Sequence, residues 1–432
     1  MDIKALEDDL RAYRPGTPGA AALHRAHVWP RYEGRCVANL AATMAGALGA
    51  SVPGALPSLA PDLTGDLLDG VQRVILLVMD ALGWLQLRRV MTRYDDVVFH
   101  RLAEQGRLVP ITTTFLSTTD SVLSSIWTGR PPSQHGLLAF ELYLREWMMA
   151  VEAIGFSSPF EPFSNTLLRW GFEPEQFLPV PSVGQALSGQ GITTVTVTHK
   201  QFTTSPLSLM HHRGVTEVRG HNDASDFWLQ LRRALHDHRG KRLLLAGYWS
   251  AVDTLGHKFG PEDESGEMEV RAISMLMDDI FLKRLDPALG EKTLLLMTAD
   301  HGQILTRRAV TPVMAEHPQL MDMLWMPPLG EGRVPFLYVR NGMYDAVWDY
   351  LHAHFGDIFV FMSREQVLES GLLGPGPLYA EVPFRVGDIV GIAREDGSVV
   401  ADFKDLDRLA GRHGGLSPEE MLVPLLAVRL DA

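Results

Sequence analysis

The stretch VILLVMD, residues 74–80, decides the fold class, because it is a short apolar run rich in β-branched residues that ends on a carboxylate. Such a run is typical of a strand buried on both faces of a parallel sheet. Six further runs share this character, at 193–197, 242–249, 293–299, 335–339, 388–393 and 421–428. Helical patterns lie between several runs, as at 226–238 and 267–285. This alternation predicts an α/β sandwich with a mainly parallel central sheet.

Composition and charge exclude several classes of protein. The 432 residues include 39 Lys and Arg against 52 Asp and Glu, a formal charge of −13, so a protein that coats nucleic acid is excluded. The 46% hydrophobic content is enough for a large core. The single cysteine, Cys36, excludes an intrachain disulfide and a thiolate zinc site, so metal chemistry has to use histidines and carboxylates. Without a signal-type or membrane-spanning run, we expect a cytoplasmic protein with no membrane association.

The chain divides into an N-terminal helical extension, residues 1–70, and a main domain, residues 71–432. Two stretches, 140–185 and 306–385, are rich in Pro, Gly, Met and aromatic residues and break the alternation of strands and helices. We interpret them as insertions that cap a site. The second is predicted to contain a small αβ unit over 336–361. The sequence indicates no oligomeric state.

Carboxylates follow three of the predicted strands. Asp80 ends the first run, Asp253 comes shortly after the run at 242–249, and Asp300 follows the run at 293–299. In open α/β sheets, ligands bind beyond the carboxyl ends of the strands. If the strands are parallel, these three carboxylates lie at one edge of the sheet.

Two motifs combine these carboxylates with histidines. Asp253 and His257 are four residues apart, so both can face one cation from a single helical turn, although a surface carboxylate and a capping histidine would give the same pattern. Asp300 and His301 end a buried strand, where a carboxylate without a partner is costly, and Gly302 permits a sharp turn. Both motifs are candidate metal ligands.

Two further segments carry polar groups with candidate roles. Thr118 and Thr119 precede a helical pattern over 121–127, and a hydroxyl at a helix N-terminus is suited to an anion such as phosphate. Helix capping by a threonine or by Asp120 is the structural alternative. His413 lies in the glycine-rich segment GRHGG, residues 411–415, which could approach a ligand closely.

In chain order, these motifs resemble the alkaline phosphatase superfamily, most closely its type I phosphodiesterase/nucleotide pyrophosphatase branch and the related PglZ-type domains. The resemblance covers residues 72–305 and 386–430. It implies that residues 71–432 form an alkaline-phosphatase-like catalytic domain, a three-layer sandwich with capping insertions. In that family the nucleophile lies nine residues before the threonine of a Thr-Gly-x-x-Pro-x-x-His-Gly string, which begins here at Thr128 and therefore identifies Thr119.

The resemblance also implies a dinuclear metal centre. One ion would be held by Asp253, His257 and His413, and the other by Asp80, Thr119, Asp300 and His301. Nitrogen and oxygen ligands without sulfur suit two divalent ions, with Zn²⁺ expected and Mn²⁺ or iron as alternatives. The implied function is hydrolysis of phosphodiester or nucleotide pyrophosphate bonds in a small phosphorylated substrate, with nucleotides among the candidates.

One departure from the family pattern leaves alternatives open. Many nucleotide pyrophosphatases carry an asparagine shortly after the His-Gly, and the stretch after Gly136 has none. Arg130 and Arg145 are candidate substitutes for that phosphate contact. A phosphomonoesterase, phosphomutase or phosphonate hydrolase of the same superfamily, or a PglZ-like module that binds a protein partner without catalysis, remain the other hypotheses.

Overall fold

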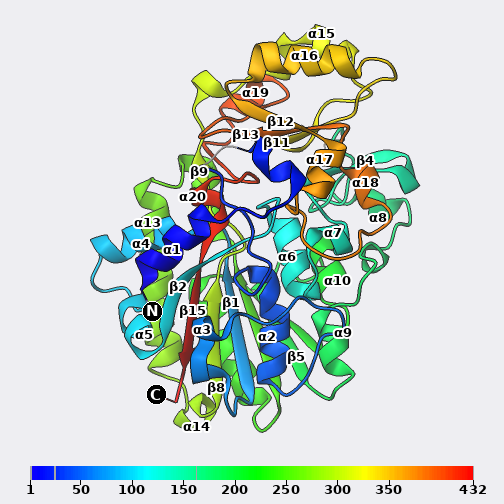
Figure 1. The fold of residues 1–432 in the computed structure, drawn as a ribbon. Coiled ribbons are helices and arrows are strands. Elements are labelled where there is room, and N and C mark those ends of the chain that lie inside the picture. The colour runs from blue at the N-terminus through cyan, green and yellow to red at the C-terminus, as the bar shows by residue number, and fades with distance from the viewer. Residues whose placement is uncertain (1, 24–25, 162, 432) are drawn as a thin grey trace.

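The computed structural model of the chain describes residues 2–23, 26–161 and 163–431 (Figure 1). Within these residues, the central sheet has seven strands in the spatial order β2-β15-β8-β1-β7-β5-β6. Their bounds are β1 (Arg73–Met79), β2 (Arg107–Thr112), β5 (Thr193–His199), β6 (Glu217–His221), β7 (Leu243–Trp249), β8 (Thr293–Thr298) and β15 (Leu422–Arg429). β15 runs antiparallel to both of its neighbours, β2 and β8, and the other strand pairs described in this sheet are parallel. The predicted mainly parallel central sheet is confirmed.

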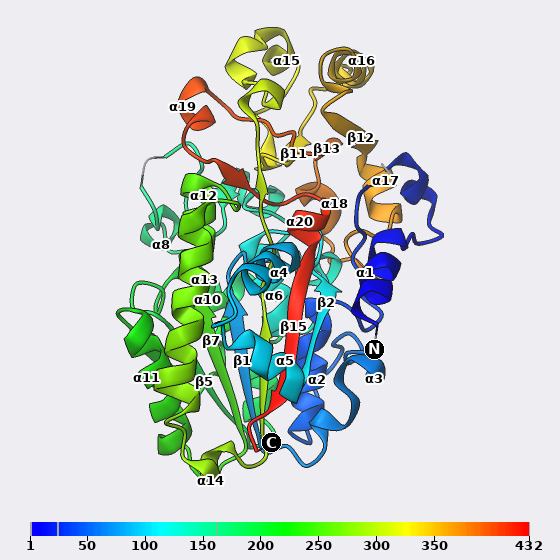
Figure 2. The same ribbon diagram turned by 90° about the vertical axis from the view of Figure 1, so that its left-hand side faces the viewer.

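Helices cover both faces of this sheet. In the view of Figure 2, α11 and α13 lie on one side of the sheet and α2 lies on the other. The helices that pack around the sheet are α1 (Ile3–Ala12), α2 (Leu40–Ala47), α3 (Pro61–Thr64), α4 (Trp84–Arg93), α5 (Phe99–Gln105), α6 (Thr119–Thr128), α9 (Val183–Ser188), α10 (Pro206–His211), α11 (Ala224–Asp237), α12 (Ala251–Phe259), α13 (Glu264–Leu276) and α14 (Pro287–Gly290). Among the described residues, none of the helices has the length and apolar character needed to cross a lipid bilayer.

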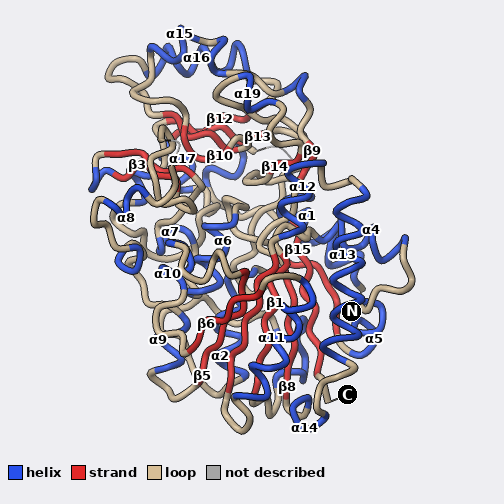
Figure 3. The backbone as a smooth tube through the Cα atoms, turned by 180° about the vertical axis from the view of Figure 1, so that it is seen from behind, coloured by secondary structure: helices blue, strands red, loops and turns tan. Residues whose placement is uncertain are grey.

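A second, antiparallel sheet lies beyond the carboxyl ends of the parallel strands, well separated from the central sheet (Figure 3). Its strands, in spatial order, are β12 (Phe359–Ser363), β13 (Ile389–Ala393), β11 (Val334–Leu337), β10 (Leu329–Glu331), β3 (Glu141–Leu144) and β4 (Met149–Glu152). The shorter elements around it are α7 (Pro132–His135), α8 (Thr166–Arg169), α15 (Pro318–Asp322), α16 (Tyr344–Phe355), α17 (Arg364–Glu369), α18 (Val382–Arg385), α19 (Phe403–Leu406), α20 (Pro418–Met421), β9 (Ile304–Leu305) and β14 (Gly411–Arg412).

The two insertions meet in this second sheet, because Gly330 of β10 pairs with Glu141 of β3. The predicted αβ unit is present as β11, α16 and β12. The expectation that the runs at 335–339 and 388–393 belong to the parallel sheet is wrong, since both pair antiparallel in this second sheet. We call the second sheet, together with the shorter elements around it, the cap. An apolar run indicates that a strand is buried, but it does not identify the strands that pair with it.

Sequence reasoning missed two strands of the central sheet, and both are edge strands. β2 contains Pro110, which lacks an N–H and is tolerated at a sheet edge. β6 carries the polar residues Glu217, Arg219 and His221, so it has no apolar run. A strand that pairs on one side only does not need the continuous hydrophobic character of its central neighbours.

The N-terminal segment packs onto the central sheet. The backbone carbonyl of Arg35 accepts a hydrogen bond from Thr112 N of edge strand β2 (2.9 Å). Leu40 and Met44 of α2 are fully buried in the same core as the central strands, and α2 contacts α6. The N-terminal segment therefore packs against α6, the helix that begins at Thr119.

A fully buried ion pair joins the cap to the loop that carries His413. Arg333, between β10 and β11, makes two hydrogen bonds of 2.8 Å to the Glu420 carboxylate, and both side chains are 0% exposed. Glu420 also accepts hydrogen bonds from Gly415 N (2.8 Å) and Ser417 N (3.1 Å). The pair therefore fixes the segment that follows His413.

Removal of one partner of this pair should destabilise the protein strongly. We expect Arg333→Met to lower the free energy of unfolding by about 3–5 kcal/mol, because a buried carboxylate loses its cation. Denaturant unfolding measures this loss. The matched control is Arg308→Met, since Arg308 makes an exposed ion pair with Asp407 and should contribute little. Equal, small losses in both variants would contradict the assigned role of the pair.

Candidate functional site

The three predicted carboxylates come together at one edge of the central sheet. β1 lies between β7 and β8, so Asp80 after β1 has the carboxyl ends of both neighbours beside it. Asp253 lies in the first turn of α12, which follows β7, and Asp300 comes two residues after β8. The parallel register of the three strands is what places these side chains together.

Asp253, His257 and His413 form the first triad. Their ligand atoms all lie within 4.8 Å of one another. Asp253 Oδ1 is 3.3 Å from His257 Nε2 and 3.9 Å from His413 Nε2. A turn of α12 supplies the first two residues, and His413 of the GRHGG segment, 156 residues after His257 in the chain, supplies the third. This donor set of one oxygen and two nitrogens is suited to a divalent transition metal.

Asp80, Asp300 and His301 form the second triad, which is completely buried. His301 Nε2 lies 3.6 Å from Asp80 Oδ1 and 3.7 Å from Asp300 Oδ2. Within the described part of the chain, these two carboxylate oxygens are buried and accept no hydrogen bond. A buried carboxylate oxygen without a partner is costly, and a cation at this point would remove the cost.

The two triads adjoin each other through their histidines. The imidazole rings of His301 and His413 are stacked, with centroids 3.8 Å apart and an interplanar angle of 19°. The ring of His257 lies 5.1 Å from that of His413. The six residues therefore form one continuous site, and two ions held by the two triads would be close neighbours.

All three histidines are oriented by hydrogen bonds to the backbone. Each Nδ1 donates to a carbonyl oxygen, which fixes the tautomer and leaves Nε2 free to act as a ligand. The bonds join His257 to Gly411 (2.8 Å), His301 to Gly302 (3.0 Å) and His413 to Ser117 (3.1 Å). The Nε2 atoms are the ones that face the carboxylates, so the site is preorganised for metal binding.

Burial controls the protonation of the site. Burial raises the pKa of Asp80 well above its usual value, and the nearby carboxylates of Asp300 and Asp253 raise it further. Burial also raises the pKa of Asp253 and holds the pKa of His413 well below its usual value. The site thus favours the neutral imidazole of His413, and it concentrates carboxylates that repel one another unless a cation lies between them.

The geometry separates the two candidate hydroxyls. Thr119 is the first residue of α6, and its Oγ1 lies 3.1 Å from His301 Nε2 at the junction of the triads. Because His301 Nδ1 carries the proton, the Thr119 hydroxyl donates to Nε2. Thr118 points elsewhere and donates to Glu331 Oε1 (2.5 Å). Thr119, and not Thr118, is therefore the hydroxyl that lies beside the second triad.

Two polar residues that sequence reasoning missed support the carboxylates. Tyr248 donates a hydrogen bond to Asp80 Oδ2, and Gln303 Nε2 donates to Asp253 Oδ1 (2.5 Å). Tyr248 belongs to a strand and Gln303 follows the Asp-His-Gly motif. Single polar contacts of this kind have no periodic pattern. The only signal in the sequence was that both residues lie close to the metal-ligand motifs.

We expect Gln303→Leu to weaken metal binding at the first triad by about 10- to 100-fold, because Asp253 loses the hydrogen bond that orients it. Calorimetric titration of the metal-free protein with Zn²⁺ measures this change in affinity. Gln190, an exposed glutamine that bonds Ser51 far from the site, provides the matched control, Gln190→Leu. Metal affinity that is unchanged in Gln303→Leu would show that Asp253 does not depend on this contact.

Gly302 is required by close packing rather than by a left-handed turn. A Cβ atom at this position would lie 2.0 Å from the backbone oxygen of Glu419 and 2.9 Å from Gly83 Cα. The expectation of a sharp turn is thus replaced by a close approach between two loops, which holds Asp300 and His301 against the segment after β1.

The candidate substitutes for the missing asparagine are engaged elsewhere. Arg130 donates to Gln134 and to the backbone of Pro53, and Arg145 pairs with Glu381. His135 has both ring nitrogens hydrogen-bonded, with Ser125 Oγ 2.9 Å from Nε2. These side chains have structural partners that account for their positions.

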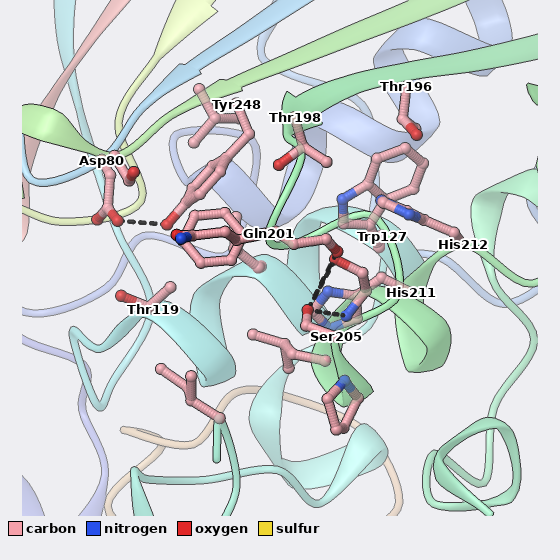
Figure 4. A pocket seen from close by; sticks show the side chains of 18 of the residues that line it. Asp80, Thr119, Trp127, Thr196, Thr198, Gln201, Ser205, His211, His212 and Tyr248 are labelled. Atoms are coloured by element: carbon pink, nitrogen blue, oxygen red, sulfur yellow. Dashed lines mark hydrogen bonds between the residues drawn. The ribbon is translucent and has the colours of Figure 1, made fainter. Parts of the chain in front are cut away.

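A cavity of about 560 Å³ opens beside Thr119 and Asp80. Figure 4 shows Trp127, Gln201 and Tyr248 along its wall. Phe202 also lines it, together with the hydroxyl-bearing residues Thr196, Thr198, Ser205 and Ser208. Aromatic faces together with amide and hydroxyl groups suit an uncharged organic group with hydrogen-bonding atoms. We call this the first cavity.

Comparison with known proteins identifies the family. The sequence profile described as type I phosphodiesterase / nucleotide pyrophosphatase matches residues 74–416. The chain belongs to this family. It is thus a phosphodiesterase-family hydrolase, and its two candidate metal triads are consistent with the dinuclear metal site typical of the family. No curated protein matches the chain at the level of sequence.

Solved structures share the fold of this phosphodiesterase-family chain at low sequence identity. Murine ectonucleotide pyrophosphatase/phosphodiesterase 5 is 18% identical, with a TM-score of 0.63 over 82% of this chain and 88% of that one. The human protein of the same name is 20% identical, with a TM-score of 0.64 over 82% and 87%. Phosphonoacetate hydrolase from Sinorhizobium meliloti is 17% identical, with a TM-score of 0.61 over 83% and 90%. The alkaline-phosphatase-like fold is thereby confirmed.

Proposed function

We propose that this protein hydrolyses phosphodiester or nucleotide pyrophosphate bonds with Thr119 as the nucleophile and two divalent metal ions as cofactors. The observation that carries the proposal is the position of Thr119 Oγ1, 3.1 Å from His301 Nε2, where the first and second triads adjoin. A hydroxyl, three carboxylates and three imidazoles in contact are the groups that phosphoryl transfer by a dinuclear centre needs.

The donor set fits a pair of Zn²⁺ ions. Asp253, His257 and His413 would hold one ion. Asp80, Asp300 and His301, together with Thr119, would hold the other, and the unpartnered oxygens of the two aspartates are in place to do so. Bound there, such ions supply Lewis-acid chemistry, because they lower the pKa of a hydroxyl and compensate charge on the attacking and leaving oxygens.

The residues of the chain then account for the reaction. Thr119 Oγ1 gives up its proton and forms a bond to phosphorus as the bond to the ester oxygen breaks, and the departing oxygen takes up a proton and leaves as the alcohol or phosphate. Water then cleaves the phosphothreonine, which releases the phosphoryl product and restores the hydroxyl. The first turn of α6 presents backbone N–H groups and the positive end of the helix dipole to phosphoryl oxygens. Burial of the second triad excludes bulk water from the carboxylates that would hold the second ion.

Substrates with an organic group on phosphorus are favoured by the first cavity, which adjoins Thr119 and has aromatic walls. A solved complex of an inactive threonine-to-alanine variant of the murine relative contains AMP. Together with the family description, this supports a nucleotide-like substrate for the present chain.

The test is a comparison of diester and monoester hydrolysis by protein of verified metal content. We expect turnover of bis-p-nitrophenyl phosphate to exceed that of p-nitrophenyl phosphate, and we expect chelation to abolish both rates. Preference for the monoester would favour the phosphomonoesterase hypothesis. Stoichiometric metal without turnover of either compound would contradict the proposal and favour a non-catalytic, partner-binding module.

A further inference from the structure

A second cavity, of about 460 Å³, meets the site from the side of the cap. Thr119 and Asp253 line both cavities, so the two open onto the same reaction centre. The walls of the second cavity come from the cap and from the segment that precedes His413, including Arg412. A substrate centred on Thr119 can therefore extend one group into each cavity.

Arg412 in the second cavity is a cation without an acidic partner. It lies in β14, directly before the triad residue His413. Its Nη2 donates to the backbone oxygen of Asp405 (3.0 Å), and the structure gives it no ion pair with any carboxylate among the described residues. Burial lowers the pKa of Arg412, yet a guanidinium stays charged at neutral pH. A partly buried cation of this kind calls for an anion.

The carboxyl groups in the same cavity do not fill this role. Glu331 accepts a hydrogen bond from Thr118, and burial raises its pKa well above the usual value. Burial also raises the pKa of Glu141 to about 7. Asp405 pairs through its carboxylate with Arg408 (3.2 Å). Glu331 and Asp405 are thus each engaged by another side chain, and neither forms an ion pair with Arg412, so its guanidinium is left for a ligand.

We propose that Arg412 forms an anion subsite that recognises a second negatively charged group on the substrate, either a carboxylate or a second phosphoryl group. The subsite rests on the proposed function, because the group must be attached to the phosphorus that Thr119 attacks. Planar guanidinium groups bind both kinds of anion through paired hydrogen bonds. The second cavity would thus select substrates by charge, whereas the first cavity selects by shape.

The test compares esters that share one leaving group. The p-nitrophenyl esters of methylphosphonate, carboxymethylphosphonate and methylenediphosphonate differ only in the second anion, and the last two distinguish carboxylate from phosphoryl recognition. We expect the better anionic ester to exceed the methyl ester in kcat/KM by about 10- to 100-fold, as for loss of a charged hydrogen bond. In Arg412→Met this preference should disappear, so that the anionic esters lose about 10- to 100-fold in kcat/KM relative to the methyl ester.

Two further variants complete the design. Arg412→Lys keeps the charge and should restore part of the preference, and Arg308→Met removes an exposed, paired arginine that does not line the cavity and should change nothing. Calorimetric affinities of metal-loaded Thr119→Ala for the same esters test the subsite without turnover. Equal affinity for all three esters, or equal losses in Arg412→Met for all three, would overturn the subsite. Absence of turnover with retained anion preference in binding would contradict only the proposed function.

Discussion

Thr119→Ala should reduce the hydrolysis of bis-p-nitrophenyl phosphate by at least about 10³-fold, because the variant lacks the hydroxyl that forms the covalent intermediate. The side chain is small and lies at the start of α6, so we expect no change in fold and retention of metal at the first triad. Steady-state kinetics, circular dichroism and metal analysis of the same preparation measure the three properties together.

Thr119→Ser is the matched control for this prediction. Serine keeps a hydroxyl in the place where the structure has Oγ1, 3.1 Å from His301 Nε2. We therefore expect it to retain activity far above that of the alanine variant. An alanine variant with a tenth or more of the original rate would show that another group, or water, attacks phosphorus.

Asp300→Asn should have the second large effect, on metal content as well as rate. Asp300 Oδ1 accepts hydrogen bonds from Ala81 N (3.1 Å) and His301 N (2.9 Å), and an asparagine oxygen can still accept both. The amide nitrogen would then replace the unpartnered Oδ2 and would point a donor at the cation position. We expect the second triad to lose its ion and the rate to fall by at least about 10³-fold.

Metal analysis distinguishes this local loss from unfolding. One ion per chain should remain at the first triad, and the thermal transition of the metal-free protein should change little. Asp96→Asn provides a control, since Asp96 is an exposed carboxylate paired with Arg271. Asp300→Asn protein that still binds two ions per chain would contradict the assignment of Asp300 as a ligand.

The central part of the site could be predicted because it follows from sheet geometry. Asp80 and Asp300 come after continuous apolar runs, and parallel strands bring their carboxyl ends to one edge. Asp253 and His257 share one helical turn, which is a local relation. The glycine-rich segment made His413 a candidate, but only the family resemblance grouped it with Asp253 and His257. Its loop reaches the site through contacts with distant segments such as Ser117 and the buried pair at Glu420.

Other features depend on tertiary contacts that leave no periodic trace. The apolar runs at 335–339 and 388–393 resemble the central strands, since both sets are buried, and only pairing partners separate the cap from the central sheet. The contacts of Tyr248 with Asp80 and of Arg412 with its cavity are set by side-chain direction. A hydrophobic pattern specifies which positions are buried, whereas tertiary packing decides which strands pair and which side chains meet.

The most direct test of the dinuclear centre is a crystal structure of zinc-loaded protein with anomalous scattering measured on both sides of the zinc absorption edge. We predict two zinc ions per chain, one bound by Asp253, His257 and His413 and the other by Asp80, Asp300, His301 and Thr119. Protein saturated with zinc that shows no ion at these two triads, or ions bound only at other residues, would contradict the account.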